Sequence, residues 1–195
     1  MTHESVKEVP GLNRADLPKL LASLSAHSHG AEVGVQKGEN ARELLLAGVG
    51  HLLLVDLWAQ QGKEYFDIAN KSAAEQDANY RETLGRMEAF PGRWTVLRGW
   101  SHLMAAQVPD GSLDFVYIDA DHKEASVTRD LEAWYPKVRA GGIVSGHDFL
   151  DSENNCGSEF GVATAVKKFC ASIGVAEVAV CQTECWPNWH FVRPA

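Results

Sequence analysis

The sequence predicts one α/β domain built on a doubly wound, mostly parallel sheet of seven strands that ends in an antiparallel hairpin. Apolar runs of strand length alternate with amphipathic stretches of helix length, as in successive β-α-β units. No repeat or low-complexity block interrupts this alternation, and 195 residues, 45% of them hydrophobic, can bury a sizeable core. The last two strand-like runs follow each other without an intervening helix, which favours antiparallel pairing.

In the first half of the chain, a leader over residues 1–28 precedes the domain, which is expected over residues 29–195. Short apolar runs predict the strands, and apolar side chains at helical spacing predict the helices. Gly48 ends the first helix, and the absence of Gly and Pro between Lys63 and Leu84 favours the second. The elements expected here are strands at 31–35, 51–58 and 94–98 and helices at 39–47 and 63–88.

In the second half, the nearly continuous apolar run at residues 113–119 predicts a strand buried on both faces. Apolar residues every three or four positions after Lys123 predict a helix that closes before Gly141. A further apolar run, a helix and the two closing runs complete the sheet. The elements expected here are strands at 113–119, 143–148, 176–181 and 186–192 and helices at 123–138 and 162–173.

Composition and charge limit the partners and the cellular location that can be expected. The formal charge of −8, from 18 Lys plus Arg against 26 Asp plus Glu, disfavours a nucleic-acid partner. No apolar run approaches the roughly 18 residues of a membrane span, so no membrane partner is expected. The acidic N-terminus is unlike a secretory signal, and four cysteines without paired spacing indicate reduced thiols, so a cytoplasmic location is expected. The oligomeric state stays open between a monomer and a homodimer.

A glycine turn follows the first predicted strand, at the edge where doubly wound sheets bind ligands. Gly34 and Gly38 allow a tight turn and a close backbone approach, and Glu32 precedes them. Asp56 ends the second strand 18 residues after Gly38, where an acid can accept both hydroxyls of a ribose. The third glycine of a dinucleotide motif is missing, which favours S-adenosylmethionine, a nucleoside without phosphates, over NAD. The alternative is a merely tight turn with Asp56 as a helix cap.

Five short motifs then occur in order: Glu32-x-Gly34-x-x-x-Gly38, Val55-Asp56-Leu57-Trp58, Arg98-Gly99-Trp100-Ser101, and the runs at residues 114–122 and 141–149. Over roughly residues 30–192, the set resembles class I S-adenosylmethionine-dependent methyltransferases with a Rossmann-like fold. Within them it looks most like methyltransferase family 24, related to catechol, caffeoyl-CoA and macrolide sugar O-methyltransferases.

The resemblance also implies which residues bind the cofactor. These are Glu32, Gly34 and Gly38 at the methionine moiety, Asp56 at the ribose, Trp58, Trp100 and Ser101 near the adenine, and Leu57, Gly99 and Asp119 elsewhere along the site. Trp58 and Trp100 are equally well explained as core aromatics.

Two groups of polar side chains follow the fourth and fifth predicted strands. Asp119 and His122 come after the fourth strand, and His147 and Asp148 end the fifth. Because the carboxyl ends of parallel strands lie at one edge of a sheet, these residues are expected to converge. Methyl transfer needs an aligned, deprotonated acceptor oxygen, which a metal ion held by carboxylates or a nearby imidazole can provide. We therefore predict these four residues to be catalytic.

The resemblance to metal-dependent O-methyltransferases implies Asp119, His147 and Asp148 as ligands of a divalent metal, Mg²⁺ or Mn²⁺, and His122 in the position of the base. An imidazole ligand in place of an oxygen favours Mn²⁺ or Fe²⁺ over Mg²⁺. The alternative is that the two acids cap the following helices and the histidines bond to loop backbone. Asp121 stays open between a ligand, a group that orients His122 and a helix cap.

Three functions remain in competition. The first is an S-adenosylmethionine-dependent methyltransferase that acts on a small-molecule acceptor, by O-methylation and with help from a divalent metal. The second is a nucleotide-dependent oxidoreductase on the same sheet, which the missing third glycine disfavours. The third is a non-catalytic S-adenosylmethionine-binding module, against which the polar residues at both strand ends argue. An RNA methyltransferase is disfavoured by the net charge of −8.

Overall fold

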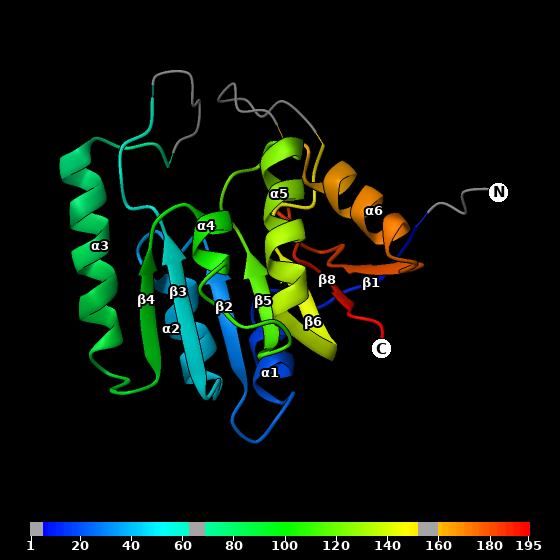
Figure 1. Ribbon diagram of the computed structural model, residues 1–195, viewed down its shortest axis with the longest axis horizontal. Coiled ribbons are helices and arrows are strands. Elements are labelled where there is room, and N and C mark those ends of the chain that lie inside the picture. Colours follow the sequence, from blue (N-terminus) through cyan, green and yellow to red (C-terminus); the bar gives the residue numbers. More distant parts are fainter. Residues whose placement is uncertain (1–5, 63–68, 152–159) are drawn as a thin grey trace.

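The computed structural model describes residues 6–62, 69–151 and 160–195. Within them, helices cover both faces of an eight-stranded sheet (Figure 1). The strands are β1 (Lys7–Pro10), β2 (His29–Val33), β3 (His51–Asp56), β4 (Trp94–Arg98), β5 (Leu113–Ile118), β6 (Val138–Gly146), β7 (Glu177–Val180) and β8 (Trp189–Val192). The helices are α1 (Leu17–Ala22), α2 (Glu39–Leu46), α3 (Ala73–Met87), α4 (Ser101–Ala105), α5 (Glu124–Trp134) and α6 (Val162–Ser172), with a 3₁₀ turn η1 (Tyr135–Lys137).

The strand order confirms the doubly wound, mostly parallel sheet that the sequence predicts. The strands run in the order β1-β7-β8-β6-β5-β2-β3-β4, and β8 pairs antiparallel with both β6 and β7. The remaining pairs are parallel. The chain leaves β2 toward β3 and β4 and then returns to β5 on the other side of β2. This reversal places the switch point, where such sheets bind ligands, between the carboxyl ends of β2 and β5.

The sheet has an eighth strand that the sequence did not predict. β1 lies within the expected leader and pairs in parallel with β7 at one edge of the sheet. It was missed because the four residues Lys-Glu-Val-Pro are mostly exposed and form no apolar run. Pro10 suits such an edge strand, because proline cannot donate a ladder hydrogen bond. The leader also supplies α1, whose Leu17 and Leu21 are buried in the core.

Several elements differ from the prediction. The helix expected over residues 123–138 ends at Trp134, and the strand expected over residues 143–148 is β6, which begins at Val138 and ends at Gly146. The helix expected from residue 63 begins at Ala73, after a capping box in which Ser72 and Glu75 exchange side-chain-to-backbone hydrogen bonds. Residues 69–72 are therefore not helical, and residues 63–68 lie outside the described part of the chain. The helix α4 was not expected, because five residues are too few to show a hydrophobic period.

Each face of the sheet has its own apolar core. The cluster on one face joins the sheet to α4, α5 and α6, with Trp134 among its buried members. The cluster on the other face joins it to α1, α2 and α3, with Trp58 among its buried members. Within the described residues, no helix has both the length and the apolar character needed to cross a membrane. Cys170, Cys181 and Cys185 are free thiols, and Cys156 lies outside the described residues.

Candidate active site at the carboxyl ends of the strands

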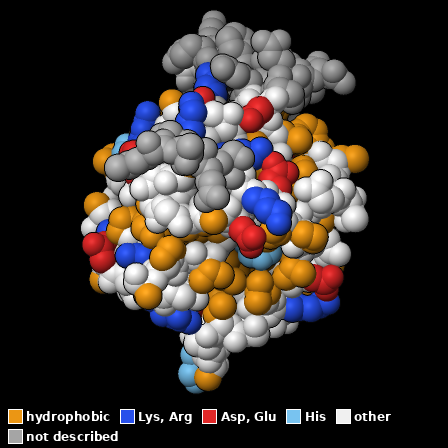
Figure 2. All heavy atoms as spheres, turned by 90° about the vertical axis from the view of Figure 1, so that its right-hand side faces the viewer, with side chains coloured by type: hydrophobic (Ala, Val, Ile, Leu, Met, Phe, Trp, Pro, Cys, Tyr) orange, Lys and Arg blue, Asp and Glu red, His pale blue; other side chains and the backbone are white. Residues whose placement is uncertain are grey.

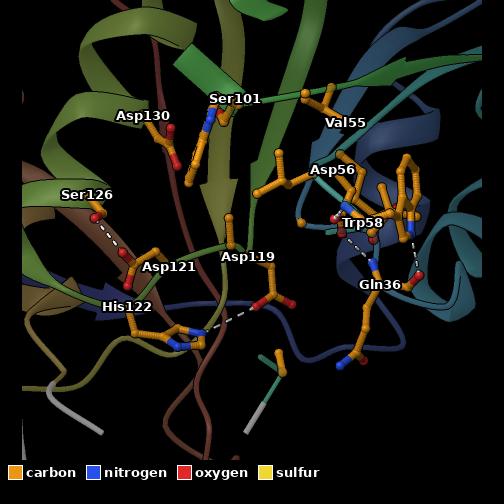
Figure 3. Close-up of a pocket in the computed structure, with 18 of the residues that line it drawn as sticks. Gln36, Val55, Asp56, Trp58, Ser101, Asp119, Asp121, His122, Ser126 and Asp130 are labelled. Atoms are coloured by element: carbon orange, nitrogen blue, oxygen red, sulfur yellow. Dashed lines mark hydrogen bonds and ion pairs between the residues drawn. The ribbon is translucent and has the colours of Figure 1, made fainter. Parts of the chain in front are cut away.

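A pocket of about 340 Å³ opens at the carboxyl ends of the central strands. Segments that follow β2, β3, β4, β5 and β6 all contribute to its walls. Figure 3 shows Asp56 and Gln36 on one side of it, Ser101 and Asp130 on another, and Asp119 with His122 on a third. Every site residue predicted from the sequence lines this pocket except Gly38 and His147, which lie next to lining residues.

The glycine turn after β2 brings backbone against backbone at the switch point. Gly34 has φ +92°, and a Cβ atom there would lie 1.9 Å from the carbonyl oxygen of Asp119. Gly38, with φ +76°, begins α2 and lies against Thr83 of α3. Between them, Gln36 also has a positive φ of +50°, which is costly for a residue with a side chain. The turn thus keeps its backbone at the pocket wall at a conformational cost.

Asp56 ends β3 with both carboxylate oxygens facing backbone donors. Its Oδ2 accepts the N–H of Gln36 and its Oδ1 accepts the N–H of Trp58, each at 2.8 Å. Burial raises the pKa of Asp56, and these backbone hydrogen bonds oppose the rise. Two further backbone N–H groups, those of Val35 and Leu57, also bond to this carboxylate, which lines the pocket.

Glu32 is a buried acid with one oxygen that lacks a partner. Its side chain is 2% exposed, and its Oε1 accepts a hydrogen bond of 3.2 Å from Asn40. Its Oε2 is buried without a hydrogen-bond partner. Burial raises the pKa of Glu32 well above its usual value, and the nearby charge of Asp119 adds to the rise. A cationic donor beside Oε2 would satisfy this oxygen and favour its ionised form.

Two tryptophans and Ser101 also line the pocket. Trp58 is fully buried against Tyr80, and its indole N–H bonds to the carbonyl of Gln36, so its ring supports the turn rather than facing solvent. Trp100, in contrast, is 49% exposed. Ser101 accepts a hydrogen bond of 2.8 Å from Trp134 and donates one to Asp130.

Asp130 of α5 is a site residue that the sequence did not indicate. It is 6% exposed and lines the pocket beside Ser101. Burial raises its pKa to about 6, although the hydrogen bond from Ser101 lowers it. The helical pattern of α5 placed Val127, Leu131 and Trp134 in the core, but it gave no signal that an acid would lie among them.

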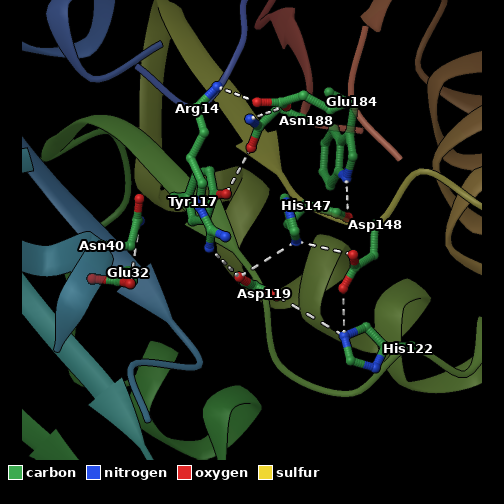
Figure 4. Close-up of polar contacts among 11 residues, drawn as sticks. Arg14, Glu32, Asn40, Tyr117, Asp119, His122, His147, Asp148, Glu184 and Asn188 are labelled. Atoms are coloured by element: carbon green, nitrogen blue, oxygen red, sulfur yellow. Dashed lines mark hydrogen bonds and ion pairs between the residues drawn. The ribbon is translucent and has the colours of Figure 1, made fainter. Parts of the chain in front are cut away.

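The acids and histidines after β5 and β6 converge in one cluster (Figure 4). Asp148 bridges two imidazoles: its Oδ2 lies 2.9 Å from Nε2 of His122, and its Oδ1 lies 2.9 Å from Nδ1 of His147. Asp119 lies 3.9 Å from the same ring nitrogens. Burial alone would raise the pKa of Asp148, but the hydrogen bonds from the two histidines outweigh it and hold this pKa well below its usual value.

Three residues of this cluster lie close enough together to hold a metal ion. Ligand atoms of Asp119, His122 and Asp148 all lie within 4.8 Å of one another. The set predicted from the sequence contained His147 in place of His122, whereas His147 bonds to the second oxygen of Asp148. Asp121 accepts hydrogen bonds from Lys123 N–H and Ser126 Oγ at the start of α5, two residues before the N-cap Lys123.

The leader contributes a cation that no sequence motif predicted. Arg14, between β1 and α1, lines the pocket, and its Nη2 lies 3.8 Å from Oδ2 of Asp119. Its backbone N–H donates a 2.8 Å hydrogen bond to Glu184. Glu184 in turn accepts from Asn188, whose amide oxygen accepts from Tyr117 of β5 (Figure 4). The approach of Arg14 depends on the docking of the leader, which no local motif encodes.

Comparison with known proteins identifies the protein family. A sequence model of methyltransferase family 24, described as a methyltransferase domain, matches residues 31–149. Among solved structures, the O-methyltransferase TomG from Streptomyces achromogenes, involved in tomaymycin synthesis, is 13% identical with a TM-score of 0.62, over 92% of this chain and 79% of that one. No curated protein matches the chain.

Two further structures share the fold. The N-methyltransferase NodS from Bradyrhizobium japonicum WM9 is 13% identical with a TM-score of 0.61, over 93% of this chain and 94% of that one. A candidate rRNA methylase from Clostridium thermocellum is 13% identical with a TM-score of 0.65, over 93% of each chain. At such identities these likenesses show the fold alone, whereas the family match covers more than half of the sequence. The chain therefore belongs to methyltransferase family 24 and is a class I S-adenosylmethionine-dependent methyltransferase.

Proposed function

We propose that the protein is an O-methyltransferase that transfers the methyl group of S-adenosylmethionine to a hydroxyl of a small molecule. The observation that carries this proposal is the presence, in one pocket, of two kinds of group. Glu32 is a buried acid and Asp56 is a partly buried one, and the two are suited to a nucleoside with an amino acid head group. Asp119, His122 and Asp148 form an imidazole–carboxylate cluster suited to proton removal.

The donor would lie along the acids of the pocket. Asp56 would accept the ribose hydroxyls at the pocket wall, where it ends β3. Glu32 would accept the ammonium group of the methionine moiety at the oxygen that has no partner. Ser101 and Asp130 border the end where the adenine would lie, and the Asp130 carboxylate can accept a hydrogen bond from the exocyclic amino group.

The acceptor would meet the histidine cluster. S-adenosylmethionine supplies an electrophilic methyl group on its sulfonium, and the acceptor oxygen must approach it in line and lose its proton. His122 is suited to take this proton because its ring is held by Asp148, which would also stabilise the imidazolium that results. His147 holds the other oxygen of Asp148 and so fixes the carboxylate in place.

A divalent metal is compatible with the same cluster. Asp119, His122 and Asp148 would hold it, and their mixture of imidazole and carboxylate favours Mn²⁺ or Fe²⁺ over Mg²⁺. When bound, such an ion lowers the pKa of a coordinated hydroxyl. His122 cannot serve as a ligand and as a base at the same nitrogen, so metal-assisted and metal-free transfer make different predictions for this residue.

A small acceptor fits the charge of the protein better than a nucleic acid. The chain carries a formal charge of −8, and phosphate backbones are bound by clustered Lys and Arg. On the face shown in Figure 2, basic and acidic side chains are interspersed. On α6, Lys167 pairs with Glu8 and Lys168 pairs with Glu124. The volume of the pocket, about 340 Å³, also falls in the range of small-molecule sites.

The donor half is tested by calorimetry with S-adenosylmethionine and, separately, with NAD. We expect the wild type to bind S-adenosylmethionine and not NAD. The affinity of Asp56→Ala for S-adenosylmethionine should fall by roughly 100-fold or more, because its contacts with the ribose are lost. Asp77→Ala, an exposed acid on α3, is the control and should leave affinity unchanged. Unchanged affinity of Asp56→Ala would refute the ribose assignment, and binding of NAD would favour an oxidoreductase.

The acceptor half is tested by methyl transfer to a panel of small hydroxyl compounds, with EDTA and with added Mn²⁺. Activity that survives EDTA but is lost in His122→Gln would support a metal-free base. Activity that EDTA abolishes and Mn²⁺ restores would support the metal. A wild type that binds the donor and methylates no hydroxyl compound, with or without metal, would contradict O-methylation and favour a binding module.

A further inference from the structure

We propose that Arg14 binds the carboxylate of the donor's methionine moiety and, with Glu32, completes a site for an α-amino acid head group. The inference rests on the proposed function, because it takes S-adenosylmethionine as the ligand of the pocket. It adds a residue from outside the segment that matches the family, which covers residues 31–149. It therefore assigns the leader a direct part in donor binding.

The structure holds the backbone of Arg14 in place while its side chain remains available. The N–H of Arg14 donates to Oε1 of Glu184 at 2.8 Å, and Oε2 of Glu184 accepts from Asn188 at 3.0 Å. The hydroxyl of Tyr117 bonds to Asn188 at 2.7 Å, so this chain of contacts is anchored in β5. Because these bonds use only the backbone of Arg14, its guanidinium is not committed to them.

The guanidinium has donors to offer a ligand. Its Nη2 lies 3.8 Å from Oδ2 of Asp119, which is too long for a hydrogen bond. The side chain is 53% exposed and lines the pocket between the leader and the end of β5, as Figure 4 shows. Arginine presents paired donors that match the two oxygens of a carboxylate.

The acidic groups around Glu32 favour a cation at this end of the pocket. In a methionine moiety, the ammonium and the carboxylate are attached to the same carbon atom, so an ammonium at Glu32 brings its carboxylate into the same region. Asp56 and Asp119 also act on Glu32 and raise its pKa, so this region is acidic. Arg14 acts in the opposite direction and lowers that pKa. Arg14 is thus placed to offset the repulsion that an incoming carboxylate meets.

The experiment measures donor-site binding by calorimetry without any acceptor, using the full-length chain and three probes. S-adenosylhomocysteine carries both charges of the head group, its decarboxylated analogue carries the ammonium alone, and 5′-methylthioadenosine carries neither. For Arg14→Ala we expect affinity for S-adenosylhomocysteine to fall at least tenfold. Affinity for the other two probes should change by less than twofold. Arg14→Lys should recover part of the loss, because lysine retains the charge without the paired donors.

Arg42→Ala is the matched control. Arg42 lies on α2, outside the pocket, and its side chain is 48% exposed against 53% for Arg14, so both variants remove one similarly exposed positive charge. We expect Arg42→Ala to bind all three probes like the wild type. Circular dichroism melting of each variant verifies that the fold is retained, which the exposure of both side chains favours.

Three results would overturn the proposal. An equal loss for all three probes would show that Arg14 supports the pocket without contacting the carboxylate. Unchanged affinity for S-adenosylhomocysteine, together with a raised KM for an anionic acceptor, would assign Arg14 to the acceptor instead. Failure of the wild type to bind any probe would overturn the proposed donor site as a whole. This result differs from a failure of the Arg14 proposal, because it is seen with the wild type before any variant is measured.

Discussion

Several residues at the pocket adopt states that cost folding free energy. Gln36, Trp58 and Asp148 have positive φ values of +50°, +41° and +55°, which are unfavourable for residues with side chains. Glu32 leaves one buried oxygen without a partner. Such costs collect where a backbone or a polar group must meet a ligand. All four of these residues line the pocket that is proposed to bind donor and acceptor.

Asp130 gives a prediction about stability and pH. A buried acid with a pKa of about 6, raised from 3.8, favours folding most when it is protonated. Its ionisation therefore removes stability as the pH rises from about 4 through about 6, by an upper bound of about 3 kcal/mol at 1.36 kcal/mol per unit. Asp130→Asn should be more stable than the wild type at pH 8, and this advantage should shrink between pH 6 and pH 4.

Urea unfolding at several pH values measures this difference. Asn keeps an oxygen that can accept the hydrogen bond from Ser101, so the variant changes the charge with little change in shape. Glu132→Gln, on the exposed side of the same helix, is the control and should not alter the pH profile. A constant difference between Asp130→Asn and the wild type from pH 4 to pH 8 would contradict the prediction.

Glu32 gives a prediction about protons released on donor binding. Burial raises its pKa well above the usual value, whereas an ammonium beside it would favour the ionised form. Binding of S-adenosylhomocysteine should therefore release protons, and its affinity should fall as the pH falls below the raised pKa of Glu32. Calorimetry in buffers with different ionisation enthalpies counts these protons. The probe 5′-methylthioadenosine lacks the ammonium, so proton release of the same size with this probe would exclude Glu32 as the source.

The sequence predicted the site residues that follow strand ends and missed those that arrive by packing. Asp119 and Asp148 could be placed together because parallel strands end at one edge of the sheet. Arg14 and Asp130 reach the same pocket from the leader and from the side of a helix. Their positions depend on how these elements dock, and neither residue belongs to a motif. The third member of the possible metal-binding set is His122 rather than His147. This choice depends on side-chain orientation, which the spacing of residues along the sequence does not determine.

At the scale of the elements, the glycine turn after β2 fixes how closely two strand ends approach. A Cβ atom at Gly34 would lie 1.9 Å from the carbonyl oxygen of Asp119, whereas one at Gly92 would meet no atom within 4 Å. Both glycines have positive φ values, +92° and +76°. Substitution of either one by Ala thus carries a similar backbone penalty, and only Gly34→Ala adds a clash.

We expect Gly92→Ala to lower the free energy of unfolding by about 1–2 kcal/mol, the cost of a left-handed residue with a side chain. Gly34→Ala should lose about 1–3 kcal/mol more, because the backbone must move to relieve the clash. Urea unfolding of the two variants measures the difference. Equal losses would show that the turn can widen freely and that the close approach to Asp119 is not required by the fold.

The element pattern was predictable where burial is strong and unpredictable where it is weak. β5 is buried along its whole length, and its apolar run predicted it well. β1 is a short, mostly exposed edge strand, and α4 is a single turn, so neither produces a hydrophobic period. α3 begins at Ala73 because the capping box at Ser72, rather than the apolar stripe, sets the first turn.

At the scale of the whole molecule, the leader connects distant parts of the fold. β1 extends the sheet along β7, and Lys167 of α6 pairs with Glu8 of β1. On the other face, α1 places Leu17 and Leu21, 1% and 0% exposed, into the core beneath α2. Between these two elements lies Arg14, at the pocket. The leader thus joins both the edge of the sheet and one of its cores.

The proposed division into a leader over residues 1–28 and a domain over residues 29–195 can be tested by truncation. A chain that begins at residue 29 loses two fully buried leucines, and truncating one buried leucine to alanine typically costs about 2–5 kcal/mol. The whole domain is expected to be stable by only about 5–15 kcal/mol. We therefore expect this truncated chain to show no cooperative unfolding transition and to expose the edge of β7 to aggregation.

A chain that begins at residue 6 is the control, because it retains β1, α1 and Arg14, and it should unfold at the same urea concentration as the full chain. Leu17→Ala and Leu21→Ala in the full chain separate loss of the core from loss of the strand, and each should lower the free energy of unfolding by about 2–5 kcal/mol. If the chain beginning at residue 29 instead unfolds cooperatively with an unchanged midpoint, the domain stands without its leader. In that case only Arg14 would connect the leader to donor binding.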